Sequence, residues 1–270
     1  MKTDNIHQFL NPPGCLNSYL AHPSGNRTSI PFALMQEHRF AFYYWSKWTQ
    51  ELNGSIPSLV TFDWHQDLSV PYKDQVPELK RLKIDNRVEV ALYTWGKLSH
   101  FNDVQIHAAV KHNMLKDVYV ICRQDVNRKE HDILKDFEGR DHYIHIFKSV
   151  EAFKNHLPKI QDNKIYLDID LDYFTYSNPL SVKNPFPNKA FTYMKKSEVI
   201  KLLSIENPMV QWLFERLAGF TMATEPEFCG GLNKSNYYLN VIDQLYFTPS
   251  LFHTVPGQNM EWTKWKHLTD

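Results

Sequence analysis

Apolar residues along the chain gather in short runs of strand length, and segments with helical spacing separate these runs. The runs are almost continuously apolar, as is typical of strands that are buried on both faces of a sheet. They cover residues 58–62, 118–123, 143–147, 164–170 and 220–224. The helical segments cover residues 104–114, 150–156, 196–203 and 207–217. This alternation predicts an α/β fold: a three-layer sandwich in which helices cover both faces of a mostly parallel central sheet.

Two segments rich in proline and polar residues, 71–86 and 176–187, interrupt this pattern. We expect them to form surface loops near the carboxyl ends of the strands, where they shape access to a site. No linker rich in glycine or serine divides the chain, and no internal repeat is visible. Residues 1–270 are therefore expected to form a single domain.

Composition adds little that points to a macromolecular partner. Lys plus Arg and Asp plus Glu number 30 each, so the formal net charge is zero and nothing favours nucleic acid. No signal-peptide core and no long apolar run is present, so no membrane span is expected. The cysteines Cys15, Cys122 and Cys229 are far apart and odd in number, which favours a reducing compartment. We expect a cytoplasmic protein, and the sequence gives no indication of its oligomeric state.

Aromatic residues make up 14% of the chain and concentrate at residues 40–48 and near Trp262 and Trp265. Such residues usually pack in the core. The segment 40–48 is also a candidate apolar wall for a substrate.

Two short acidic clusters follow apolar runs directly. Their members are Asp63, His65 and Asp67 in the first cluster and Asp168, Asp170 and Asp172 in the second. Residues two apart in an extended segment point the same way, so each cluster presents its side chains on one face. Buried carboxylates need a partner, and two divalent ions that share bridging carboxylates, roughly 3.5–4 Å apart, would neutralise both clusters. The alternative is acidic capping of two helices.

These clusters resemble those of the arginase/deacetylase superfamily. The motif Asp63-x-His65-x-Asp67 precedes an Asp-x-Asp motif by about a hundred residues, and His38 lies upstream. Ureohydrolases carry Gly-Gly-Asp-His-Ser around the upstream histidine. This chain has Met35-Gln36-Glu37-His38-Arg39 instead, which argues against a close relative of ordinary arginase or agmatinase.

A divergent arginase-like family, which includes the peptide arginases of ribosomal peptide biosynthesis, is a better match over roughly residues 30–232. The resemblance rests on Glu37-His38, Phe62-Asp63-x-His65-x-Asp67, Ser99-His100 and Leu167-Asp168-Ile169-Asp170-Leu171-Asp172-Tyr173-Phe174 with Asn178-Pro179. It implies an arginase/deacetylase-like fold and hydrolysis of arginine side chains in a precursor peptide to ornithine and urea.

The resemblance also implies two Mn²⁺ ions per chain. The ligands of the first ion would be His38, Asp63, Asp67 and Asp168, and those of the second His65, Asp63, Asp168 and Asp170. Asp63 and Asp168 would then bridge the ions, and this oxygen-rich set suits Mn²⁺ better than zinc. Asp172 is left as a hydrogen-bond partner or a helix cap.

Three residues are implied in catalysis. Asp67 or His100 would pass a proton to the departing amine, although a lone histidine is often merely structural. Glu225 would grip the guanidinium, with Glu227 as the alternative and a solvated loop acid as the plain explanation.

Other functions remain open at the level of the sequence. One is an arginase or agmatinase type of hydrolase that acts on a small guanidino compound. Another is a single-zinc, deacetylase-like amidohydrolase, which has no need of His38, Asp67 or Asp170 as ligands. A two-metal phosphoesterase is disfavoured because no basic phosphate clamp lies near the clusters. The last is a metal-stabilised binding protein without turnover.

Overall fold

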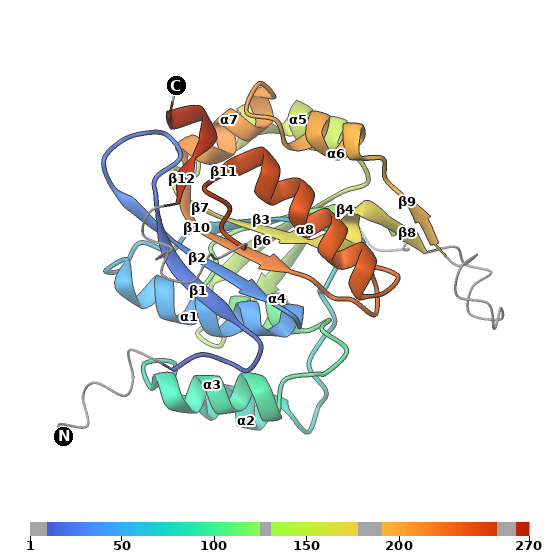
Figure 1. Ribbon diagram of the computed structural model, residues 1–270. Coiled ribbons are helices and arrows are strands. Elements are labelled where there is room, and N and C mark those ends of the chain that lie inside the picture. The colour runs from blue at the N-terminus through green and yellow to red at the C-terminus, as the bar shows by residue number, and fades with distance from the viewer. Residues whose placement is uncertain (1–9, 125–130, 178–190, 253–262, 270) are drawn as a thin grey trace, which may run out of the picture.

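The centre of the molecule is an eight-stranded sheet, seen in a computed structural model that describes residues 10–124, 131–177, 191–252 and 263–269 (Figure 1). The strand order is β1-β2-β10-β7-β3-β4-β6-β5. The strands are β1 (Leu16–Ala21), β2 (Ser29–Met35), β3 (Ser58–Asp63), β4 (Val118–Cys122), β5 (His131–Lys135), β6 (Asp141–Phe147), β7 (Ile165–Asp170) and β10 (Leu217–Ala223). The inner strands run parallel, and β1 and β5 pair antiparallel at the two edges. The predicted mostly parallel sheet is confirmed.

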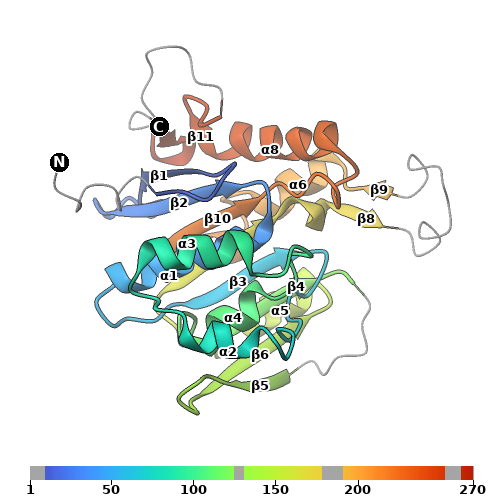
Figure 2. The ribbon, with the colours of Figure 1, turned by 90° about the horizontal axis from the view of Figure 1, so that it is seen from below.

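Helices cover both faces of this sheet (Figures 1 and 2). On one face pack α1 (Ala41–Glu51), α2 (Val76–Arg81), α3 (Arg87–Gly96) and α4 (Gln105–Lys111). On the other pack α5 (Val150–His156), α6 (Lys196–Leu203), α7 (Pro208–Glu215) and α8 (Leu232–Tyr246). Two small ribbons complete the fold, β8 (Thr175–Ser177) with β9 (Phe191–Tyr193) and β11 (Phe247–Thr248) with β12 (Lys264–Trp265).

The inner strands read as continuous apolar runs because their side chains alternate between two separate cores. In β4, Val118 and Val120 pack with α1–α4, whereas Tyr119 and Ile121 pack with the helices of the opposite face. Every residue of β3, β4 and β7 is buried. A polar residue at the end of such a strand is therefore largely withdrawn from water.

The five predicted strands are present as β3, β4, β6, β7 and β10, and the four predicted helices as α4 to α7, with shifted ends. The prediction of a loop over residues 71–86 is wrong in part, because α2 lies within it. Of the second expected loop, residues 176–187, the structure describes only positions 176 and 177, which belong to β8.

The aromatic residues at 40–48 pack in the core, as expected of such residues, and do not form the alternative, a substrate wall. Phe40, Phe42, Tyr43, Tyr44 and Trp45 are each at most 2% exposed. They belong to η2 (His38–Phe40) and α1 and pack inside the core beneath the sheet. Trp265 is likewise buried, and Trp262 lies outside the described residues.

All three cysteines are free thiols. Within the described residues, no helix combines the length and the apolar composition that crossing a membrane requires.

Candidate metal centre

Four adjacent strands bring the candidate residues together at their carboxyl ends. In the order β2, β10, β7 and β3, these strands are neighbours in the middle of the sheet. His38 follows β2, Glu225 follows β10, Asp170 ends β7, and Asp63 ends β3. Ligands in parallel α/β sheets bind at this edge, so the sequence correctly predicted where both acidic clusters would lie.

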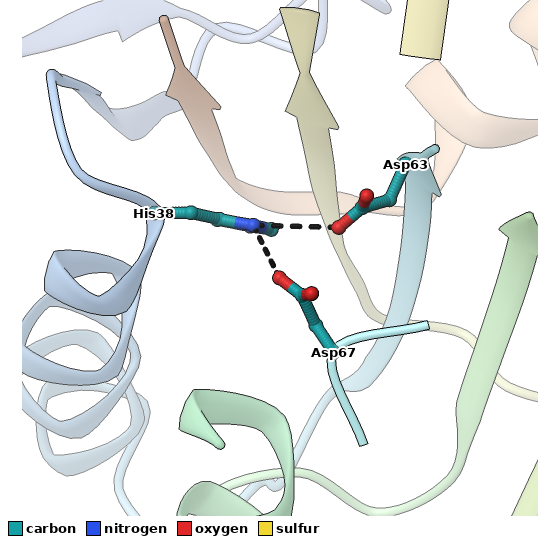
Figure 3. A group of neighbouring side chains, drawn as sticks. All are labelled: His38, Asp63 and Asp67. Carbon is teal, nitrogen blue, oxygen red and sulfur yellow. Dashed lines mark ion pairs between the residues drawn. The ribbon is translucent and has the colours of Figure 1, made fainter. Parts of the chain in front are cut away.

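His38 lies at the middle of this group and is fully buried. Its Nδ1 atom is 2.8 Å from Asp67 Oδ2, 3.2 Å from Asp170 Oδ2 and 3.4 Å from Asp63 Oδ2. Figure 3 shows the contacts with Asp63 and Asp67. Nevertheless, Nδ1 and Asp63 Oδ2 are buried atoms without a hydrogen-bond partner. A ring nitrogen and several carboxylate oxygens converge on one point here, which is how ligands are arranged around a shared cation.

A second group forms around Asp63 on the other side. His65 Nδ1 lies 2.9 Å from Asp172 Oδ2 and 3.9 Å from Asp63 Oδ1. Asp172 lies in η4 (Leu171–Phe174), and its Oδ1 accepts a hydrogen bond from the Trp64 backbone N–H at 2.9 Å. Its Oδ2 is buried and has no hydrogen-bond partner. Three groups in the described residues could hold an ion, the third being His38, Asp170 and Glu225. Because Asp63 belongs to two of them, it is positioned to contribute to two ions.

Asp168 has different surroundings from the other acids. Thr61, Asp168 and Thr221 lie in one row across β3, β7 and β10. Thr221 Oγ1 donates to Asp168 Oδ1 at 2.6 Å, and Thr61 Oγ1 donates to Oδ2 at 2.7 Å. Oδ2 also lies 2.8 Å from His38 Nε2. Protein donors thus occupy both oxygens, which differs from the expectation that Asp168 bridges two ions.

The His38–Asp168 contact also orients the imidazole ring. If Nε2–H donates to Asp168, the lone pair of Nδ1 faces Asp63, Asp67 and Asp170. Metal-binding histidines are usually oriented by a carboxylate in this manner.

The electrostatics of the group show an excess of buried negative charge. Burial raises the pKa of Asp63 well above its usual value, and the charges of Asp67 and Asp172 add to this effect. Burial and the neighbouring Asp172 raise the pKa of Asp170 to about 7. In the described part of the chain, the ion pairs of the clustered acids are with His38 and His65. Two imidazoles do not balance this many carboxyl groups, whereas divalent cations do.

Glu225 holds the loop that carries His38. Its Oε1 accepts a hydrogen bond from the His38 backbone N–H at 3.0 Å, and its backbone φ is +32°. Burial raises the pKa of Glu225 well above its usual value, with a further contribution from Asp170. A left-handed backbone at a glutamate costs on the order of 1 kcal/mol, and such strain is common at functional sites.

Asp67 is held by a residue that the sequence did not single out. Its φ is +50°, and the fully buried Gln105 donates from Nε2 to Asp67 Oδ2. Gln105 begins α4, about forty residues further along the chain, and no motif marks it. The sequence did not single out Thr61 or Thr221 either. Each contacts Asp168 from a neighbouring strand, and no motif marks it.

A cavity of about 630 Å³ opens over the group. Asp67, Asp103 and Glu225 contribute carboxylates to its lining, and Phe101 and Phe228 contribute aromatic rings. The other lining residues are His65, Gln66, Leu68, Ser69, Asn102 and Gln124, so no described lysine or arginine lines it. An acidic cavity with aromatic walls suits a cationic ligand.

His100 and Glu227 lie apart from this cavity. His100 is exposed, its ring centroid lies 4.3 Å from that of Phe101, and it lines a neighbouring cavity of about 510 Å³ with Arg39. Glu227 is exposed and does not line the acidic cavity. The structure thus brings Glu225, but neither His100 nor Glu227, to the candidate centre.

The donor set, the unpaired buried atoms and the acidic cavity describe a centre that fits two divalent cations. A comparison with models of known protein families, and another with curated proteins, found no match for this chain.

Proposed function

We propose that the protein is an arginase-like hydrolase with two Mn²⁺ ions, which converts an arginine side chain of a precursor peptide to ornithine and urea. The observation that carries this proposal is the acidic cavity, which opens onto two groups of candidate ligands, all but His65 buried, that share Asp63. The free thiols fit a cytoplasmic enzyme.

The geometry supports a ligand assignment that differs from the one implied by the family resemblance. His38, Asp63, Asp67 and Asp170 would hold the first ion, and His65, Asp63, Asp170 and Asp172 would hold the second. Asp63 and Asp170 would then contribute to both ions, while Asp168 orients His38. This oxygen-rich set with two imidazoles favours Mn²⁺. Two Mn²⁺ ions bound there would lower the pKa of a shared water and so supply hydroxide at neutral pH.

The remaining residues bind the substrate and move its proton. Glu225 faces the guanidinium from the cavity wall, while its Oε1 remains fixed by the backbone N–H of His38. Phe101 and Phe228 pack on the side chain that carries the guanidinium. Water adds to the guanidinium carbon, the bond from this carbon to the side-chain nitrogen breaks, and the nitrogen takes up a proton. Asp67 lines the cavity and His100 does not, which favours Asp67 as the group that passes this proton.

The charge of the cavity also bears on the size of the substrate. Free arginine carries an α-carboxylate, and no described lysine or arginine lines the cavity to pair with it. An arginine within a peptide has no such carboxylate, and neither does a decarboxylated guanidine such as agmatine. The same lack of basic residues disfavours a phosphoesterase. The close contact of His38 with Asp67 disfavours a single-zinc deacetylase, which needs neither residue.

The test is urea release by the Mn²⁺-loaded protein. For an arginine-containing peptide, we expect a kcat/KM at least about tenfold above that for free arginine, or about 1.4 kcal/mol of transition-state binding. Mass spectrometry should show a loss of roughly 42 Da for each converted residue.

The variant Asp63→Asn, which lacks the shared ligand, is the control for contaminating arginase. Faster turnover of agmatine than of any peptide would favour the small-guanidine hydrolase instead. If no guanidine releases urea, the hydrolase proposal fails and a binding function remains.

A further inference from the structure

Three histidines meet at the β5 edge of the sheet, outside the candidate centre. His131 lies on β5, His145 on β6 and His156 at the end of α5. His145 pairs in register with His131 on one side and with Tyr119 of β4 on the other. Tyr119 is near the amino end of β4, so the cluster lies away from the carboxyl edge that carries the acidic cavity.

Two ring nitrogens in this cluster approach closely, since His131 Nδ1 and His145 Nδ1 are 2.9 Å apart and share a hydrogen bond. The ring centroids are 5.0 Å apart for His131 and His145, 5.1 Å for His145 and His156, and 6.4 Å for His131 and His156. On one tetrahedral zinc ion, imidazole nitrogens lie about 3.3 Å apart and ring centroids roughly 5 Å apart. The His131 and His156 rings are farther apart than this spacing, so His156 would have to turn toward the other two rings to share an ion with them.

The neighbouring side chains hold the rings in this arrangement. His145 stacks on Tyr119 with centroids 5.1 Å apart and an interplanar angle of 8°. His156 packs against Phe147 at 5.2 Å. The Tyr119 hydroxyl is fixed in turn by Asp162, to which it donates at 3.0 Å. Aromatic packing explains the stacked rings, and the hydrogen bond between His131 and His145 directs two ring nitrogens toward each other, as two ligands of one ion require.

We propose that His131, His145 and His156 bind one zinc-like divalent ion, with His131 and the open fourth position at the surface. Three imidazoles form a nitrogen-only donor set, which suits Zn²⁺, Ni²⁺ or Cu²⁺, whereas the acidic centre suits Mn²⁺. The ion would fasten the β5–β6 hairpin to α5.

The protonation of the cluster is compatible with metal binding. Burial, together with the neighbouring His156 and His131, lowers the pKa of His145 to about 4. Burial and the nearby Lys159 also lower the pKa of His156. Both rings are therefore neutral at pH 7, as a metal ligand must be.

The test is equilibrium dialysis of Zn²⁺ with protein saturated in Mn²⁺, for the parent and for His131→Gln, His145→Phe and His156→Gln. We expect each variant to bind one Zn²⁺ fewer than the parent, or to bind it at least about tenfold more weakly. His131 is exposed, so its replacement leaves the core intact even if one of the other variants folds poorly. His145→Phe retains an aromatic ring against Tyr119.

His267→Gln is the matched control. It removes an imidazole that stacks on Phe214, at 6.0 Å, and that has no second histidine among its described ring contacts. The control should bind as much Zn²⁺ as the parent. In Cu²⁺-loaded parent protein, electron paramagnetic resonance should show nitrogen hyperfine splitting that His131→Gln reduces. Equal Zn²⁺ binding by the parent and all three cluster variants would overturn the proposal and leave a packed aromatic cluster.

Discussion

Asp168 and Asp170 are two positions apart on β7, yet their surroundings differ. Asp168 lies within the sheet between Thr61 and Thr221, whereas Asp170 ends the strand and faces His38 Nδ1. The sequence predicted that the acids of this cluster would share a face, because side chains two apart in a strand point the same way. The same periodicity cannot tell which acid lies at the strand end. That depends on the neighbouring strands, which come from distant parts of the chain.

Metal content should distinguish the roles of these acids. We expect Asp63→Asn to lose both ions, because Asp63 belongs to both ligand groups, and Asp172→Asn to lose one. Asp168→Asn should still bind two ions, about 10- to 100-fold more weakly, because its effect passes through His38. Elemental analysis after dialysis against graded Mn²⁺ measures both quantities.

Asp136→Asn is the control for these variants, since Asp136 is a buried acid that pairs with Arg140. It should retain both ions. If Asp168→Asn loses the same number of ions as Asp63→Asn, then Asp168 is a ligand and the assignment is wrong.

Glu225 offers a sharper test of substrate binding. In Glu225→Gln, kcat/KM for the preferred guanidine should fall by about 100-fold, because a charge-assisted contact worth roughly 2–3 kcal/mol is lost. Its metal content should remain that of the parent. Glu227→Gln, at an exposed acid two positions away, should show parental kinetics. Equal effects of the two substitutions in the urea assay would exclude a special role for Glu225.

At the scale of elements, the strands whose two faces are covered by helices could be predicted from their continuous apolar runs. Elements with less regular residue patterns, such as β2 and α1, were not predicted. β2 contains Pro31, which argued against a strand, but its pairing with β10 begins only at Phe32, so the missing N–H lies outside that ladder. In α1, eight of the 11 residues are buried. Its first five residues are all apolar, so the helical spacing of Ala41, Tyr44, Trp45 and Trp48 is hard to recognise in the sequence.

Gly219 of β10 marks a close approach between the sheet and α1. A Cβ atom at this position would lie 2.7 Å from Trp48 Cε3 and 3.1 Å from Tyr166 Cδ1. We expect Gly219→Ala to reduce the free energy of unfolding by about 1–3 kcal/mol through overpacking. The melting temperature should fall by about 2–4 °C for each kcal/mol lost. The control is Gly96→Ala in α3, where no atom lies within 4 Å of the added methyl group. A similar melting temperature for both variants would contradict this account of β10.

For the whole molecule, the buried acids predict that stability without metal depends strongly on pH. The pKa of Asp170 is about 7 in the folded state, and the pKa values of Asp63 and Glu225 are also raised. These carboxyl groups therefore hold more protons in the folded chain than in the unfolded chain above about pH 4, so their contribution to stability should fall as the pH rises to 7 and beyond.

Thermal unfolding with a chelator, and with excess Mn²⁺, checks this expectation. The chelated protein should melt at a lower temperature at pH 8 than at pH 5.5, and the stabilisation by Mn²⁺ should be larger at pH 8. Asp170→Asn, which removes one of the titrating acids, should show a weaker dependence on pH in the chelator. A melting temperature that is independent of pH and of Mn²⁺ would contradict a metal centre.

The order of the strands was beyond prediction from local patterns. β10 lies between β2 and β7, although more than 180 residues separate the start of β10 from the end of β2. Pairing over such distances is set by how the faces pack rather than by neighbours in the chain. The sequence therefore predicted that the acidic clusters would share one edge of the sheet, but not that their strands, β3 and β7, would be direct neighbours.

The central place of β10 also has a consequence for synthesis on the ribosome. Until residue 223 has emerged, β1 and β2 lack the strand that joins them to β7 and the rest of the sheet. His38 then stays apart from Asp63, Asp67 and Asp170, although the nascent chain already contains all four. Under the proposed function, the centre would therefore be complete only after β10 has emerged, and a shorter nascent chain would have neither the metal ions nor an activity that depends on them.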